Sequence, residues 1–240
     1  NFFANHDQPR PVSRFGNTEN FHYESASMLA TILLSLTGTP FIYYGEEIGM
    51  PNADYASIEE YRDVDTINFF EIGRQQGKPS EQLMQTIRYM SRDNARSPMQ
   101  WNSEEYGGFS KNEPWIPLGR RYQQVNVEKD RASDRSLFEE YRTLIALRKK
   151  TPALIHGSFR QIKTECDDVL AFKKNYREDE YLVYANMAPH DIQTRLALES
   201  DTADVESVYT NYGRATTKAR KLHLRPYEAC IFRVLRYSNK

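Results

Sequence analysis

Two short apolar runs, with a helical pattern between them, open the chain. They occupy residues 1–5 and 39–45, and the second is apolar on both faces, as a fully buried strand is. From residue 23 to residue 36, apolar side chains recur at helical spacing, and Gly38 stands where such a helix would stop. A strand, a helix and a strand in this order predict one βαβ unit, with parallel strands joined by a right-handed crossover.

The stretch that follows is long, charged and irregular. Residues 46–131 contain one clear helical pattern, which begins at Ser80. A loop region of this length usually carries function or forms an inserted subdomain. Ser133 and Asp134 are then expected to cap an amphipathic helix over residues 137–148.

Beyond that helix the pattern changes. Between residues 155 and 237, β-prone runs such as 169–172, 181–185 and 229–234 recur, with turn residues between them. Short strands of this kind predict an antiparallel sandwich. We place the boundary between the helical and irregular part and the β-prone part near residue 152.

The charge balance argues against a nucleic acid as partner. The chain carries 32 Lys and Arg against 33 Asp and Glu, for a net charge of -1, and the two signs are interleaved. No apolar stretch approaches the ~20 residues that a membrane-spanning helix needs, so we expect no membrane partner either.

The cysteine content favours a reducing compartment. Cys166 and Cys230 are too few for a disulfide framework, although they could still form one bridge. The chain starts at Asn1 inside a strand-like run, without Met or a basic leader. We interpret it as part of a longer protein, so the absence of a signal peptide is uninformative.

Polar residues follow the first apolar run. His6 and Asp7 are expected at the carboxyl end of a parallel strand, the edge at which barrels and open sheets bind ligands. There the pair can exchange hydrogen bonds with a polyol, while the carboxylate supports developing positive charge. The alternative is that Asp7 only caps the next turn and His6 is a core histidine. No second His or Cys falls at ligand spacing, so we expect no metal.

Two more carboxylates, Glu46 and Glu47, follow the second run. With Asp7 they suggest a glycosidase pair, because glycoside hydrolysis needs two carboxylates, roughly 5–5.5 Å apart in retaining enzymes. The alternative carries at least equal weight: one Glu binds backbone at the rim and the other faces solvent.

Arginines and tryptophans mark the irregular region. Arg88, Arg92 and Arg96 are four residues apart and would line one face if a helix persists through them. A guanidinium suits hydroxyls or carboxylates, although an arginine stripe is usually a solvated face. Trp101 and Trp115 either stack on sugars or pack the long loop.

Taken together, these strings resemble the alpha-amylase family of glycoside hydrolases (family 13), in the group of oligo-1,6-glucosidases, dextran glucosidases and trehalose-6-phosphate hydrolases. The resemblance covers essentially the whole chain, in family order. Its strings are Asn5-His6-Asp7-Gln8-Pro9-Arg10, Gly38-Thr39-Pro40-Phe41-Ile42-Tyr43-Tyr44-Gly45-Glu46-Glu47-Ile48-Gly49-Met50, Tyr61-Arg62-Asp63-Val64-Asp65 and Ser91-Arg92-Asp93-Asn94-Ala95-Arg96-Ser97-Pro98-Met99-Gln100-Trp101.

The resemblance implies an α/β plus all-β fold. Residues 1–152 would be the C-terminal part of a catalytic (β/α)8 TIM barrel, with its seventh and eighth strands, long rim loops and last helix. Residues 153–240 would be a C-terminal antiparallel β-sandwich.

The resemblance also implies roles for five residues. Asp7 matches the family's third acidic residue, which stabilises the transition state, and His6 matches its hydroxyl-binding neighbour. Arg92 matches an arginine that helps hold the non-reducing glucose in exo-acting members, and Arg96 is the neighbouring candidate. Asp65 falls where some members place an acidic residue of the acceptor subsite. The family's nucleophile Asp and acid/base Glu belong to earlier strands, so Glu46 and Glu47 are not promoted to those roles.

The resemblance therefore implies a cytoplasmic, retaining exo-α-glucosidase that acts on short α-1,6-linked or related gluco-oligosaccharides without a cofactor. Trehalose-6-phosphate hydrolase is the alternative in the same fold. A non-catalytic, amylase-like ancillary protein is the alternative of another class, against which the retention of His6, Asp7 and Arg92 argues. The chain by itself is expected to be inactive, because it needs the upstream part of the barrel.

Overall fold

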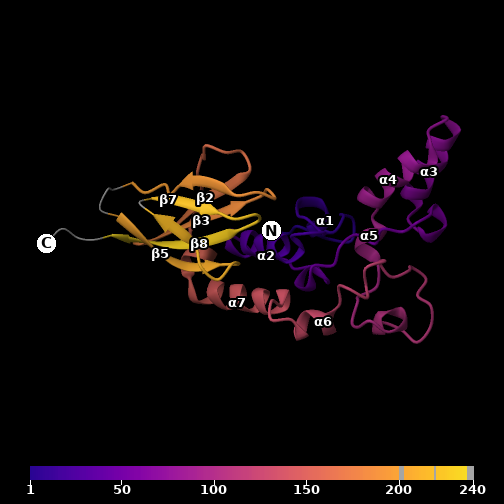
Figure 1. Cartoon of the computed structure of the whole chain (residues 1–240), viewed down its shortest axis with the longest axis horizontal. Helices are drawn as coiled ribbons and strands as arrows, with labels where there is room; N and C mark the ends of the chain where they lie inside the picture. The colour runs from indigo at the N-terminus through magenta and orange to yellow at the C-terminus, as the bar shows by residue number, and fades with distance from the viewer. Residues whose placement is uncertain (200–202, 219, 237–240) are drawn as a thin grey trace. The chain divides into compact units, whose positions relative to one another are not determined.

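The computed structural model describes residues 1–199, 203–218 and 220–236 of the 240-residue chain (Figure 1). The chain folds as two compact units. Unit 1 comprises Asn1, Phe15–Phe41 and Glu140–Lys240, and unit 2 comprises Phe2–Arg14 and Ile42–Glu139.

Unit 1 contains two antiparallel sheets, drawn in orange and yellow in Figure 1. The five-stranded sheet has the order β1-β2-β3-β8-β5, and the three-stranded sheet has the order β4-β7-β6. The strands are β1 (Ser158–Gln161), β2 (Val169–Tyr176), β3 (Asp179–Asn186), β4 (Ile192–Arg195), β5 (Ala203–Thr210), β6 (Thr216–Lys218), β7 (Lys221–Leu224) and β8 (Ala229–Arg236).

The alternation of side chains along β3 builds two cores in unit 1. Leu182 and Tyr184 point to one face, where they pack with residues of the smaller sheet such as Leu222. Tyr181 and Val183 point to the other face. Three helices pack against this second core: α2 (His22–Ser35), α7 (Leu137–Lys150) and α8 (Pro152–His156). They contribute Leu34, Leu144 and Leu154 to it.

A buried arginine donates hydrogen bonds to carbonyl groups at the C-terminal end of α2. Arg148 Nη1 donates to the carbonyls of Leu34 and Leu36, both at 2.8 Å, and of Leu154 at 3.0 Å, while its Nη2 donates to Gly38 at 2.6 Å. The last carbonyls of a helix have no partner within the helix, so this side chain satisfies groups that would otherwise be buried unpaired.

A second buried cation lies close to Arg148. Lys174 on β2 donates from Nζ to the hydroxyl of Thr37 and, at 3.1 Å, to the carbonyl of Gly157. Its side chain is fully buried. Burial, together with the charge of Arg148, lowers the pKa of Lys174 to about 8.

Unit 2 is built from helices and loops. Its main pair is α3 (Val64–Gln75) and α4 (Ser80–Met90), which lie side by side (Figure 1) because Gly73 lets the side chain of Leu83 approach the α3 backbone. The shorter elements are α1 (Pro11–Phe15), η1 (Glu46–Ile48), η2 (Ile58–Glu60), α5 (Asp93–Arg96), η3 (Glu105–Gly108) and α6 (Val127–Ala132).

The periodic segments are confirmed. The helices predicted over residues 23–36, from Ser80 and over 137–148 are α2, α4 and α7. The three β-prone runs are β2, β3 and β8, all paired antiparallel. The predicted β-rich region ends at Tyr237, which lies outside the described residues.

The two strands predicted at residues 1–5 and 39–45 are wrong for this chain. Among the described residues, neither segment is a strand, and Phe41, expected to be buried, is 64% exposed. Two main-chain hydrogen bonds are formed between them, from the Asn1 amine to Thr39 O and from Phe41 N to Asn1 O, both at 2.8 Å. A parallel strand is fixed and buried by neighbours on both sides, and two bonds at the single residue Asn1 do not extend into a ladder.

The start of α7 also differs from the prediction. Ser136, not Ser133 with Asp134, caps this helix: its Oγ accepts the backbone N–H of Glu139 at 3.2 Å. Asp130 supports the same end by accepting the N–H of Leu137 at 2.8 Å. The cap therefore lies directly before the first helical residue, where the free N–H groups point.

None of the helices within the described residues is both long enough and apolar enough to cross a membrane. Cys166 and Cys230 are both free thiols, the second of them buried.

Candidate active site

The turn after Asn5 presents Asp7 and His6 to solvent. The backbone N–H of Asp7 donates to the Asn5 side chain at 2.8 Å, which fixes the start of the turn. His6 Nε2 lies 3.1 Å from Asp7 Oδ2, and the two side chains are 69% and 44% exposed. His6 is therefore not a core histidine, and both groups are accessible to a ligand.

A fully buried arginine anchors this turn from behind. Arg10 donates from Nε to the carbonyl of Asn94 at 3.0 Å and from Nη1 to the carbonyl of Tyr44 at 2.6 Å. Its guanidinium also lies 4.7 Å from the centre of the Tyr44 ring. Arg10 thus joins the turn that carries Asp7 to the short helix α5, which carries Arg96.

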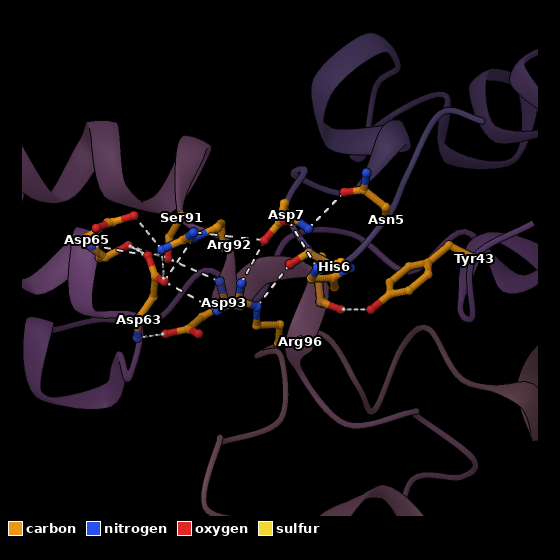
Figure 2. Close-up of polar contacts among 12 residues, drawn as sticks. Asn5, His6, Asp7, Tyr43, Asp63, Asp65, Ser91, Arg92, Asp93 and Arg96 are labelled. Carbon is orange, nitrogen blue, oxygen red and sulfur yellow. Dashed lines mark hydrogen bonds and ion pairs between the residues drawn. The ribbon is translucent and has the colours of Figure 1, made fainter. Parts of the chain in front are cut away.

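A break between the helices α4 and α5 places two arginines next to this turn. The stripe predicted for Arg88, Arg92 and Arg96 is interrupted, because α4 ends at Met90 and α5 begins only at Asp93. Arg88 instead donates to the carbonyl of Tyr55 at 3.1 Å. Arg92 and Arg96, on either end of the short helix α5, form the network drawn in Figure 2.

Arg96 makes the direct contact with Asp7. Its Nη2 donates to Asp7 Oδ1 at 2.9 Å, and its Nε donates to the carbonyl of His6 at 3.0 Å. Arg92 lies one step further away, with Nη1 at 4.0 Å from the same Asp7 oxygen. Its Nη2 contacts the exposed carboxylate of Asp65 at 2.5 Å. Sequence-predicted residues 6, 7, 65, 92 and 96 are thus brought together (Figure 2).

A carboxylate that sequence reasoning missed stands between the arginines. Asp63 is buried and accepts hydrogen bonds from both Arg92 and Arg96 through Oδ1. Burial alone would raise the pKa of Asp63, but the hydrogen bonds from Arg92 and Thr66 leave that pKa below its usual value. Asp63 also caps α3, so the Asp-x-x-Thr spacing to Thr66 was the available signal.

The segment that carries Asp63 is held by a second carboxylate. Asp93 is buried, and its Oδ2 accepts the backbone N–H groups of Arg62 at 2.6 Å and Asp63 at 2.8 Å. Ser91 adds a further link, with Oγ at 2.9 Å from the hydroxyl of Thr66. The helix break and the N-terminus of α3 therefore support each other.

A pocket of about 240 Å³ adjoins the network between α3 and α4. Its lining combines Asp65 and Arg92 with apolar side chains, among them Phe69, Ile87 and Met90. Within the part of the chain that the structure describes, no group of three His, Cys, Asp or Glu side chains is arranged to hold a metal ion.

The side chains of Glu46 and Glu47 both accept hydrogen bonds from backbone N–H groups. Glu46 is buried and accepts the N–H of Tyr43 at 3.4 Å, and Glu47 accepts the N–H of Gly45 at 2.7 Å. Burial raises the pKa of Glu46 to about 7.

Trp101 and Trp115 are 49% and 76% exposed, so neither is packed into a core.

Comparison with known proteins places this chain in a family. The model of the alpha amylase catalytic domain matches residues 1–157. The chain is 40% identical to an oligo-1,6-glucosidase of Bacillus cereus over 234 residues, which are 97% of this chain and 42% of the relative. It is also 40% identical to a trehalose-6-phosphate hydrolase of Escherichia coli K12 over 228 residues, which are 95% and 41% of the two chains.

A solved structure agrees with these relatives. Trehalose-6-phosphate hydrolase of Bacillus licheniformis matches with a TM-score of 0.93 and 33% sequence identity, over 98% of this chain and 43% of that one. The chain thus spans about two fifths of the length of the proteins that it matches. Because the family model covers well over half of the described sequence, the chain belongs to the alpha-amylase family of glycoside hydrolases, in the group of oligo-1,6-glucosidases and trehalose-6-phosphate hydrolases.

Proposed function

We propose that this chain is the C-terminal part of a retaining exo-α-glucosidase that releases glucose from short α-1,6-linked or related oligosaccharides. The observation that carries the proposal is the geometry at Asp7. One oxygen of this exposed carboxylate is held by Arg96, and the other lies beside His6. A fixed carboxylate with open faces suits a site where positive charge develops on a sugar ring.

The proposed roles follow from which groups remain available. Asp7 stabilises the oxocarbenium-like transition state by its charge and does not transfer a proton. Arg92 uses Nε and Nη2 on Asp63 and Asp65, which leaves Nη1, facing Asp7, for a hydroxyl of the non-reducing glucose. His6 binds a neighbouring hydroxyl, and Asp65 contacts the acceptor sugar.

The proposed architecture is the last quarter of a (β/α)8 barrel over residues 1–152, followed by an antiparallel sandwich over 153–240. Two observations support this division. The family match ends at residue 157, and β1 begins directly after it at Ser158. In the whole protein, residues 1–5 and 39–45 would gain the neighbouring strands that their ladders need.

The proposed nucleophile Asp and acid/base Glu lie in the part of the relatives that this chain does not span. The coverage of 41–43% of the matched proteins supports this proposal. The chain alone is then inactive, because glycoside hydrolysis needs both carboxylates. We place the protein in the cytoplasm, which suits its two free thiols.

Trehalose-6-phosphate hydrolase is the second candidate, favoured by the equal identity to the Escherichia coli relative. A substrate panel on the full-length protein separates the two. Hydrolysis of isomaltose and isomaltotriose is expected, with retention of the α-anomer in the first glucose released. Activity confined to trehalose 6-phosphate would select the second candidate.

Loss of Asp7 provides the test of the site itself. Asp7→Asn in the full-length protein is expected to abolish turnover while the fold is kept, because an exposed side chain contributes little to stability. Turnover at the wild-type rate would refute the role of Asp7. No hydrolysis of any α-glucoside by the wild type would instead favour the non-catalytic, ancillary alternative.

A further inference from the structure

We propose that Asp63 is a positioning residue, which orients the guanidinium groups of Arg92 and Arg96 toward Asp7. The proposal rests on the proposed function for its kinetic consequences. Asp63 is buried, and its Oδ1 accepts hydrogen bonds from both arginines, so we assign it an action through them.

The first argument is the way that one oxygen serves two arginines. Asp63 Oδ1 lies 2.9 Å from Arg92 Nε, 2.7 Å from Arg92 Nη2 and 3.3 Å from Arg96 Nη1. The contact with Arg92 uses two of its nitrogens, so it fixes the plane as well as the position of that guanidinium.

The second argument is electrostatic. Arg92 and Arg96 lie one helical turn apart and aim at the same carboxylate, so their positive charges repel each other. The side chain of Asp63 is only 4% exposed, so its charge interacts strongly with the arginines. Asp65, which also contacts Arg92, is 76% exposed, so solvent and salt screen its charge. Asp63 is therefore the group that permits both arginines to converge.

The third argument is that Asp63 cannot easily move. Its Oδ2 accepts the hydroxyl of Thr66 at 2.8 Å and the N–H of the same residue at 3.2 Å. Its own N–H donates to Asp93 at 2.8 Å. The carboxylate is thus fixed at the N-terminus of α3, where the helix favours a negative charge.

The variant Asp63→Asn tests the proposal in the full-length protein. An amide keeps the shape but loses the charge and one acceptor, so the arginines lose their common anchor. A misplacement of catalytic groups of about 1 Å costs about a hundredfold, and we expect a fall of that size in kcat/KM, with a higher KM and a lower kcat. Simple loss of folded protein would lower the apparent kcat and leave KM unchanged.

Asp130→Asn is the matched control. Asp130 also holds a helix N-terminus, accepting the N–H of Leu137 and of Phe138, but it has no contact with the arginine network. The control is expected to lose thermal stability and to keep both KM and kcat per folded molecule. An equal rise in KM in both variants would overturn the proposal.

A double-mutant cycle tests whether Asp63 acts through Arg92. In an Arg92→Lys background the contact through two guanidinium nitrogens is already lost and only the contact with Arg96 remains, so Asp63→Asn should cost less than it does alone. Fully additive losses in kcat/KM would contradict positioning through this arginine.

A structural readout separates this proposal from the proposed function. In a crystal structure of the Asp63→Asn variant, Arg96 Nη2 is expected to move out of hydrogen-bond range of Asp7, from the 2.9 Å of the unmodified chain. An unchanged contact would refute positioning even if the enzyme loses activity. If the wild type is no glucosidase, the proposed function fails and this distance still decides the role of Asp63.

Discussion

Arg96 holds Asp7 by two routes at once, through the carboxylate at 2.9 Å and through the carbonyl of the preceding residue, His6, at 3.0 Å. The turn and its acidic side chain are thus fixed by one planar group. This relationship makes the identity of residue 96 testable independently of its charge.

Arg96→Lys in the full-length protein is expected to lower kcat/KM about 10- to 100-fold, because a hydrogen bond to a charged group contributes about 1.5–3 kcal/mol. Lysine keeps the charge but presents a single nitrogen, which cannot reach both acceptors in the same geometry. Steady-state kinetics on isomaltose measure the change. Arg120→Lys is the control, since that arginine is half exposed and lies 3.7 Å from Glu60. Equal activity of both variants would contradict the expectation.

The buried carboxyl of Glu46 predicts a pH-dependent stability. Its pKa is about 7 in the folded protein against 4.5 ordinarily, so the folded state binds more protons between these values. Stability from this group therefore falls as the pH rises from 4.5 to 7. Glu46→Gln keeps an acceptor for the Tyr43 N–H without the charge, and should gain up to about 3 kcal/mol relative to wild type over that window. Urea unfolding at pH 5 and pH 8 measures it, and a pH-independent difference would refute it.

Lys174 predicts the opposite slope at alkaline pH. Its pKa is about 8 in the folded protein against 10.5 ordinarily, so the unfolded chain binds more protons between these values. Stability from this group is lost as the pH falls through 8 and is fully present above 10.5. The free energy of unfolding of wild type minus that of Lys174→Met should therefore increase between pH 8 and pH 10. A constant difference would show that Lys174 titrates normally.

The close packing of α3 on α4 predicts that Gly73 tolerates no larger side chain. A Cβ at this position would lie 2.5 Å from the side chain of Leu83. Gly73→Ala should therefore cost about 1–3 kcal/mol, as overpacking of a core does. Leu83→Ala makes room, so the double variant should lose less than the sum of the two single losses. Strict additivity, measured by chemical denaturation, would argue that the helices simply move apart.

The cap of α7 distinguishes two serines. Ser136→Ala should lose about 1 kcal/mol, the usual contribution of a helix cap. Ser133→Ala, at the position that the sequence suggested, should stay within about 0.5 kcal/mol of wild type, as exposed substitutions do. Thermal unfolding of the two variants compares them directly, and a larger loss at Ser133 would contradict the cap seen in the structure.

Sequence pattern predicted the elements that carry dense apolar runs and are buried. The helix α2 and the strands β2, β3 and β8 are of this kind, and their apolar side chains form the cores of unit 1. The helix α3 was missed for the opposite reason. Its residues Phe69 and Ile72 are 42% and 53% exposed, and its contact with α4 uses a glycine. A helix held by a cap and a close backbone approach shows no apolar stripe.

The candidate site was partly predictable. His6, Asp7, Arg92 and Arg96 were chosen from motifs, and the structure brings them together. Asp63 was not chosen, because its position depends on the break between α4 and α5, and on burial that no local pattern encodes. Residues 1–5 failed as a strand since the pairing of a parallel strand depends on segments distant in sequence.

The division of the chain has a consequence for its biosynthesis. Unit 1 is discontinuous: Phe15–Phe41, including α2, is separated by the whole of Ile42–Glu139 from the strands and helices on which it packs. At the usual 5–20 residues per second of translation, roughly 5–20 seconds pass between the appearance of the two parts. During that interval the carbonyls that Arg148 will satisfy, and the side chains of α2 that pack on the second part of unit 1, lack those partners. The nascent chain therefore exposes apolar side chains of α2 until the second part of unit 1 has been made, and chaperones that bind apolar surface would act in that interval.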